Sequence, residues 1–161
     1  LRYNERRWEN LRLGPDSEML LPEVAGQLLD IEVEVEMFGT GTVSVKLFCS
    51  PDGEAEPEET VIGYDREAGT LYIDTRRSCA EGMGVQGIEA GPLVLATNEP
   101  LRLRVLVDRS IVEVFANDRQ ALLRRVYPSR ATSVHVKLFT QGCAAHVRHL
   151  ACWEMMPSNP Y

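Results

Sequence analysis

Apolar and polar side chains alternate along much of this chain, and the clearest run covers residues 31–37. There, Ile, Val, Val and Met alternate with Glu at every second position. A period of two is typical of a β-strand with one buried face and one solvated face. The Glu row is therefore interpreted as a solvated sheet face. Alternation resumes over residues 42–49 after Gly39-Thr40-Gly41, which predicts a β-hairpin.

Short strand patterns continue at regular spacing and predict an all-β chain. Residues 50–59 are rich in Pro, Gly, Asp and Glu and are expected to form a loop, and a Gly-rich connection is expected over 80–92. Residues 22–29 could carry one helical turn at most. We predict an antiparallel two-sheet β-sandwich of the jelly-roll or concanavalin-like type, without substantial helix and as one module over 1–161. The remaining strands are expected at 60–64, 70–74, 101–107, 111–116, 121–127, 133–140 and 145–155.

Composition narrows the classes of partner. A formal net charge of −7 disfavours nucleic acid and anionic membrane surfaces and favours neutral ligands. The sequence begins without Met, a basic segment or an apolar segment, so we expect it to be a piece of a longer polypeptide. The four cysteines are too scattered for structural zinc; two disulfides or four buried thiols both stay open. The compartment is undecided, with an extracellular location preferred to a cytoplasmic one.

Recognisable catalytic chemistry is absent from the sequence. It contains no nucleophile elbow, phosphate-binding loop or His-Glu-x-x-His motif, which leaves paired-carboxylate glycoside hydrolysis as the only enzymatic class to test. On a strand, His146 and His149 would point to opposite faces, so we expect no metal site. By the same alternation, Trp153 is predicted to face the core. No cofactor is indicated.

The most informative stretch is residues 103–118, in which two strand patterns flank an Asp108-Arg109-Ser110 corner. Asp and Ser side chains commonly fix such turns by bonding to nearby amides. Glu113 follows among apolar residues, where an unpaired buried charge would be costly. We therefore expect Glu113 to pair with Arg109, Arg124 or Arg125.

Several segments together resemble one known module. Residues 107–118, Val-Asp-Arg-Ser-Ile-Val-Glu-Val-Phe-Ala-Asn-Asp, resemble the hallmark of the C-terminal β-sandwich in glycoside hydrolase family 32, which includes invertases, levanases and inulinases. Residues 60–65 with 71–78 resemble the module's middle hairpin, and Arg125-Val126-Tyr127-Pro128 resembles the strand ending after the hallmark. The resemblance spans nearly the whole chain.

The resemblance implies a parent β-fructosidase whose N-terminal five-bladed propeller carries two catalytic Asp and one Glu. None of those motifs transfers to this chain. Asn117-Asp118 is followed by Arg119, no Arg-Asp-Pro occurs, and none of the cysteines follows a Glu. The isolated chain is therefore expected to be non-catalytic, while its parent is expected to act on sucrose, levan or inulin.

Three roles stay open: a partner that stabilises the propeller, a fructan-binding module like a related family that holds terminal fructose, or a domain for propeller docking or homodimerisation. Sugar recognition needs carboxylate and guanidinium groups with an aromatic face. Alternatively, the same groups lock a corner by mutual ion pairs. The candidates form two clusters that are expected to lie near each other, with an aromatic face from Tyr64 or Tyr72. The first cluster is Asp74, Arg76, Arg77 and Ser78, and the second is Asp108, Arg109, Ser110 and Glu113.

Overall fold

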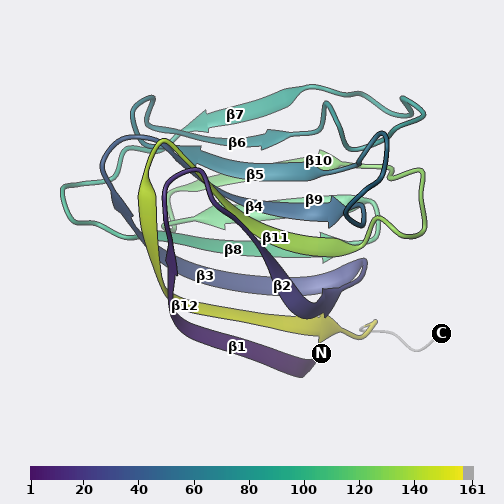
Figure 1. Ribbon diagram of the computed structural model, residues 1–161, viewed down its shortest axis with the longest axis horizontal. Coiled ribbons are helices and arrows are strands. Elements are labelled where there is room, and N and C mark those ends of the chain that lie inside the picture. Colours follow the sequence, from purple (N-terminus) through teal and green to yellow (C-terminus); the bar gives the residue numbers. More distant parts are fainter. Residues whose placement is uncertain (158–161) are drawn as a thin grey trace.

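The computed structural model describes residues 1–157, which form two six-stranded antiparallel sheets and no helix (Figure 1). Sheet A has the strand order β1-β12-β3-β8-β9-β10, and sheet B has the order β2-β11-β4-β5-β6-β7. The predicted two-sheet β-sandwich is therefore confirmed. The strands are β1 (Arg2–Leu13), β2 (Glu18–Ala25), β3 (Leu28–Phe38), β4 (Thr42–Cys49), β5 (Thr60–Asp65), β6 (Thr70–Asp74), β7 (Ile88–Pro92), β8 (Leu101–Asp108), β9 (Ile111–Ala116), β10 (Gln120–Arg125), β11 (His135–Gln141) and β12 (Ala144–Met155).

The core lies between the two sheets because alternate side chains of each strand point into it. In β3 the inward residues are the apolar ones of the alternating run, and Ile31 is completely buried. Sheet B contributes Ile62 and Ile73 from β5 and β6, each 0% exposed. Burial of apolar surface on both inner faces contributes most of the free energy that holds the two sheets together.

The predicted hairpin between residues 31–37 and 42–49 is wrong. The two strands belong to different sheets, because β3 pairs with β12 and β8 while β4 pairs with β11 and β5. Gly39-Thr40-Gly41 is instead a corner at which the chain passes from sheet A to sheet B. Alternation is the same for a strand in a hairpin and for a strand in the opposite sheet of a sandwich, so the pattern did not distinguish them.

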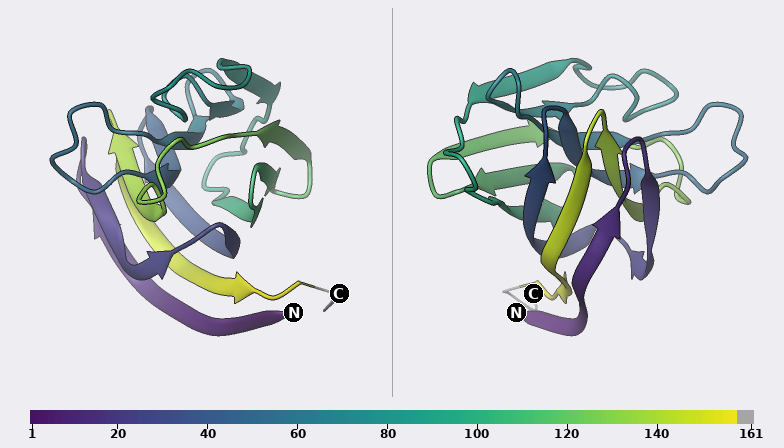
Figure 2. Two further views of the ribbon diagram at one scale, coloured as in Figure 1. Left: turned by 90° about the vertical axis from the view of Figure 1, so that its right-hand side faces the viewer. Right: turned by 60° about the vertical axis from the view of Figure 1, so that its left-hand side comes forward.

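Three strands lie outside the predicted set. β1 and β2 cover most of the first 25 residues, and β7 lies within the segment expected to be a Gly-rich connection. Residues 22–25 and 28–29 belong to β2 and β3, with a bend at Gln27 between them, and the segment carries no helical turn. Figure 2 shows β1 and β12 as long, curved strands that run side by side, consistent with their antiparallel pairing.

A β-bulge in β12 reverses two further expectations. Its register against β3 shifts between Val147 and His149. The extra residue brings His146 and His149 to the same outer face, opposite Glu36 and Glu34 of β3. The bulge also turns Trp153 outward, where the guanidinium of Arg2 lies 4.0 Å from its ring centroid. The predictions of opposite faces and of a core Trp153 were therefore wrong.

All four cysteines are buried free thiols. Burial raises the pKa of Cys49 and Cys152 to about 12, so both stay protonated and pack as small apolar groups. Within residues 1–157, no helix is long and apolar enough to cross a membrane.

Candidate functional site

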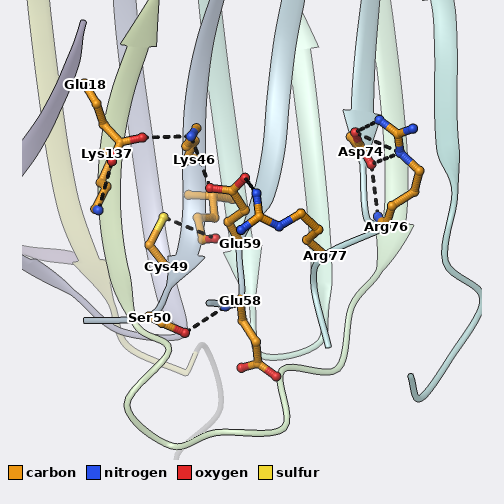
Figure 3. Close-up of polar contacts among 11 residues, drawn as sticks. Glu18, Lys46, Cys49, Ser50, Glu58, Glu59, Asp74, Arg76, Arg77 and Lys137 are labelled. Carbon is orange, nitrogen blue, oxygen red and sulfur yellow. Dashed lines mark hydrogen bonds and ion pairs between the residues drawn. The ribbon is translucent and has the colours of Figure 1, made fainter. Parts of the chain in front are cut away.

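A network of ion pairs covers the outer face of sheet B near the start of β5 (Figure 3). The ammonium of Lys46 lies 2.8 Å from Glu18 and 3.1 Å from Glu59, and Lys137 reaches the same Glu18 carboxylate at 3.0 Å. Arg77 joins the network through Glu59 at 3.2 Å. The hydrogen bonds from Lys137 to Asp52 and Glu18 stabilise its ammonium and raise the pKa of Lys137.

The first predicted cluster lies beside this network, where β6 ends. Asp74 accepts hydrogen bonds from the amide, Nε and Nη2 of Arg76 at 2.7–3.0 Å. Burial alone would raise the pKa of Asp74, but the bonds from Arg76 outweigh it and lower the pKa. Ser78 is buried and donates to the carbonyl of Thr75 at 2.8 Å. Asp74 and Arg76 are thus occupied by each other. Arg77 and Ser78 instead bind Glu59 and Thr75, which lie outside the cluster.

The two candidate aromatic residues have different surroundings. Tyr64 is 1% exposed within the core, so its ring faces no ligand. Tyr72 lies on the outer face of sheet B directly over Gly63, where a Cβ atom would fall 2.2 Å from the Tyr72 ring. Glycine at position 63 therefore allows the ring to approach the sheet closely. Of the two candidate tyrosines, Tyr72 is the one that is half-buried on the surface near Asp74.

The second predicted cluster forms the tight turn between β8 and β9. Arg109 has a left-handed backbone, with φ of 53°, and its amide donates to the carbonyl of Gln27 at 2.7 Å. Val126 donates to the carbonyl of Ser110 at 2.8 Å. Backbone bonds therefore fix this corner, and within residues 1–157 neither Asp108 nor Ser110 forms a side-chain hydrogen bond.

Glu113 differs from the expectation of a buried ion pair. It is half-buried on the outer face of sheet A, in register with Leu106 and Leu123, while Val112 and Val114 face the core. In the described part of the chain it pairs with none of the three expected arginines. Arg124 instead contacts Glu89 at 3.4 Å and the carbonyl of Val85 at 2.8 Å.

The two clusters lie in different sheets but at the same end of the sandwich. Arg124 is the neighbour of Val112 in β9, and its guanidinium also reaches the hydroxyl of Thr75 at 3.4 Å. Thr75 directly follows Asp74 of the first cluster. Val112 lies two residues after Ser110 of the second cluster, so Arg124 lies between the two clusters. Within residues 1–157, no hydrogen bond or ion pair links the clusters directly.

Sequence reasoning missed Glu58, a buried carboxylate at the base of the loop between β4 and β5 (Figure 3). It accepts hydrogen bonds from the amides of Ala80 and Ser129 at 2.9 and 2.8 Å, and from the hydroxyl of Ser133 at 2.6 Å. The Ser129 hydroxyl also donates to it. Burial would raise its pKa, but these bonds together lower the pKa to about 2. Glu58 thus joins three separate loops.

Sequence reasoning also missed a groove of about 830 Å³ on the outer face of sheet A. The chain provides charged groups from β3 and β8, including Glu34 opposite Arg102. Phe115 of β9 is 43% exposed and lines the same groove, which the turn between β9 and β10 borders. Alternation marked these side chains as outward, but only the sheet pairing shows that they share one hollow.

Comparison with known proteins gives the family. The model of "Glycosyl hydrolases family 32 C terminal" matches residues 1–154. The chain belongs to this family. The resemblance inferred from residues 107–118 and the other segments is thereby confirmed, and the twelve-strand sandwich is the structure of a C-terminal module from a family 32 protein.

Relatives of this family 32 module agree with the assignment. A levanase of Bacillus subtilis strain 168 is 31% identical over 154 residues, which is 93% of this chain and 22% of the levanase. A fructan 1-exohydrolase IIa from Cichorium intybus has a TM-score of 0.81 at 16% identity, covering 99% of this chain and 36% of that one. A β-fructofuranosidase of Aspergillus kawachii gives 0.81 at 20% identity, covering 98% and 29%. These two structures support the fold alone. The chain spans 14–25% of the length of the first curated relatives.

Proposed function

We propose that this family 32 module is the non-catalytic C-terminal part of a β-fructosidase and supports a catalytic propeller in the same polypeptide. The observation that carries the proposal is the match of residues 1–154 to the C-terminal module of a hydrolase family. The absence of the family's Arg-Asp-Pro and Glu-Cys motifs from the sequence supports a non-catalytic role. The parent would release fructose from sucrose or from a fructan such as levan or inulin.

Co-expression of this chain with the polypeptide encoded directly upstream of Leu1 tests the proposal. We expect the two halves to co-elute on sizing, and we expect the upstream half to lose stability and fructan hydrolysis when it is produced alone. Sizing of the chain alone reports whether it forms a homodimer instead. Hydrolysis of levan, inulin or sucrose by the pure 161-residue chain would contradict the proposal, as would an upstream sequence without a propeller.

Fructan binding by the predicted clusters is a second candidate function. It is favoured by the position of the Tyr72 ring, which packs closely over Gly63 near Asp74 and Arg76. Such an aromatic ring flanked by a carboxylate and a guanidinium suits the mixed apolar and hydroxylated faces of a sugar. In this role the two predicted clusters would bind the sugar together: Asp74, Arg76, Arg77 and Ser78 from the first, and Asp108, Arg109, Ser110 and Glu113 from the second. Calorimetric titration with levan, inulin and fructose tests it; binding that persists in both Asp74→Ala and Asp108→Ala excludes these two residues.

A further inference from the structure

The groove on the outer face of sheet A combines an aromatic surface with polar groups that have no partner in the protein. Phe115 supplies the aromatic surface. Among the described residues, the side chains of Arg102, Asp118 and His149 line the groove without a hydrogen bond or ion pair. Polar groups gathered in a hollow and free to bond outward are the usual features of a ligand site.

The neighbouring backbone holds this site in one conformation. Asn117 is 6% exposed, and its side-chain oxygen accepts from the Arg102 amide at 2.8 Å while its own amide donates to the Arg102 carbonyl at 2.9 Å. Its side-chain amide donates to the carbonyl of Pro100 at 2.9 Å. Asn117 and Asp118 both have left-handed backbones, with φ of 49° and 53°, and lie in the three-residue connection 117–119 of the tight β9–β10 hairpin. Arg102 and Asp118 thus start from fixed backbone positions, which lowers the entropy cost of binding.

Charge and size indicate the class of ligand. The lining contains three carboxylates (Glu32, Glu34 and Asp118) and three guanidiniums (Arg102, Arg104 and Arg119), so their formal charges balance. A balanced groove attracts neither a phosphate nor a cationic polymer strongly. Its volume of about 830 Å³ lies within the range of sites that hold small ligands, about 300–1,000 Å³.

We propose that this groove binds a neutral, hydroxyl-rich oligosaccharide. A sugar ring would place its C–H face on Phe115 while its hydroxyls accept from Arg102 and donate to Asp118. The site is separate from Asp74 of sheet B and from Arg76, which follows the end of β6. The choice of fructan probes rests on the proposed function, whereas the location of the site does not.

Calorimetry and amide chemical-shift mapping of the 161-residue chain test this proposal, with short oligosaccharides of levan, inulin and cellulose as probes. At least one probe is expected to bind and to shift the amides of Arg102 and Phe115. Phe115→Ala and Arg102→Gln should each weaken that binding about tenfold. The matched controls are Leu123→Ala, an exposed apolar residue on the next strand, and Arg12→Gln, an exposed arginine of sheet A outside the groove. Neither control should change the affinity, and melting curves should show that all four variants fold.

Three results would overturn the inference. The first is that no probe shifts the groove amides. The second is binding that maps to Asp74 and Arg76, or that survives both groove variants. The third is that the groove variants weaken association with the upstream polypeptide and leave sugar binding unchanged. A module that supports the upstream half but binds no oligosaccharide would retain the proposed function and lose only this inference.

Discussion

Glu58 connects its own loop, between β4 and β5, with two loops from other parts of the chain. Its own amide bonds the hydroxyl of Ser50 at 2.8 Å, and its carboxylate collects donors from Ala80, Ser129 and Ser133. A carboxylate that accepts several bonds is stabilised in its charged form despite burial. Glu58 therefore makes the folded state depend on its ionisation.

Glu58→Gln should lower the free energy of unfolding by about 2 kcal/mol at neutral pH, because the amide side chain presents donors to groups that already donate. The folded-state pKa of about 2 lies below the ordinary value of 4.5. The stabilisation by ionised Glu58 is thus complete above about 4.5 and is lost as the pH falls towards 2. Denaturant unfolding across this pH range should show a smaller loss of stability in Glu58→Gln than in the original chain. Parallel pH profiles would contradict this role.

At the residue scale, the sequence predicted polar character better than it predicted partners. Arg76 lies in the turn two positions after Asp74, the last residue of β6, so their pairing follows from proximity in the chain. The position of Glu113 also follows from alternation, because Val112 and Val114 occupy the core, although the apolar neighbours suggested burial. The Glu58 site could not be predicted, since its donors lie 22–75 residues away along the chain.

At the element scale, two corners that connect the sheets pack against each other. The β3–β4 corner contains Gly41, and the β11–β12 corner contains Gly142. A Cβ atom on Gly41 would fall 2.4 Å from the carbonyl oxygen of Gln141, and Gly41 has a φ of 144°. Glycine is therefore required at position 41 both by backbone conformation and by space.

Gly41→Ala should destabilise the protein by about 3 kcal/mol, because the methyl group meets backbone that cannot move aside freely. Gly39→Ala is the matched control: it also has a positive φ, of 96°, but a Cβ atom there meets nothing within 4 Å. Its cost should be about 1–2 kcal/mol from backbone strain alone. Chemical denaturation of both variants measures the difference, and equal losses would show that the packed corners add nothing.

The same corner shows why strands could be predicted more reliably than their pairing. Alternation marked β3, β4, β8 and β9 closely, because each has one face in the core. Pairing depends on contacts between distant segments, as in β12 with β3, and the bulge in β12 changed which residues face outward. The residues that line the groove on sheet A are brought together by this strand pairing and by the bulge. They could therefore not be identified as one site from the sequence.

At the scale of the whole molecule, the chain crosses repeatedly between the sheets, so neither sheet can keep its core after the other separates. β1, β3, β8–β10 and β12 of sheet A alternate along the chain with groups of strands from sheet B. Each sheet also buries its apolar face only against the other. We therefore expect the sandwich to unfold as one cooperative unit.

A core substitution in sheet B tests this cooperativity with probes in sheet A, because Trp8 and Trp153 both lie on sheet A strands. Ile62→Ala removes a completely buried side chain of β5 and should cost about 3 kcal/mol, or about 10 °C in Tm. Tryptophan fluorescence and far-ultraviolet circular dichroism should report the same lowered midpoint. Leu20→Ala, a 47% exposed position on sheet B, should shift neither signal appreciably. If fluorescence kept its original midpoint in Ile62→Ala while circular dichroism lost amplitude earlier, sheet A would be stable without its partner and the two faces would not form one core.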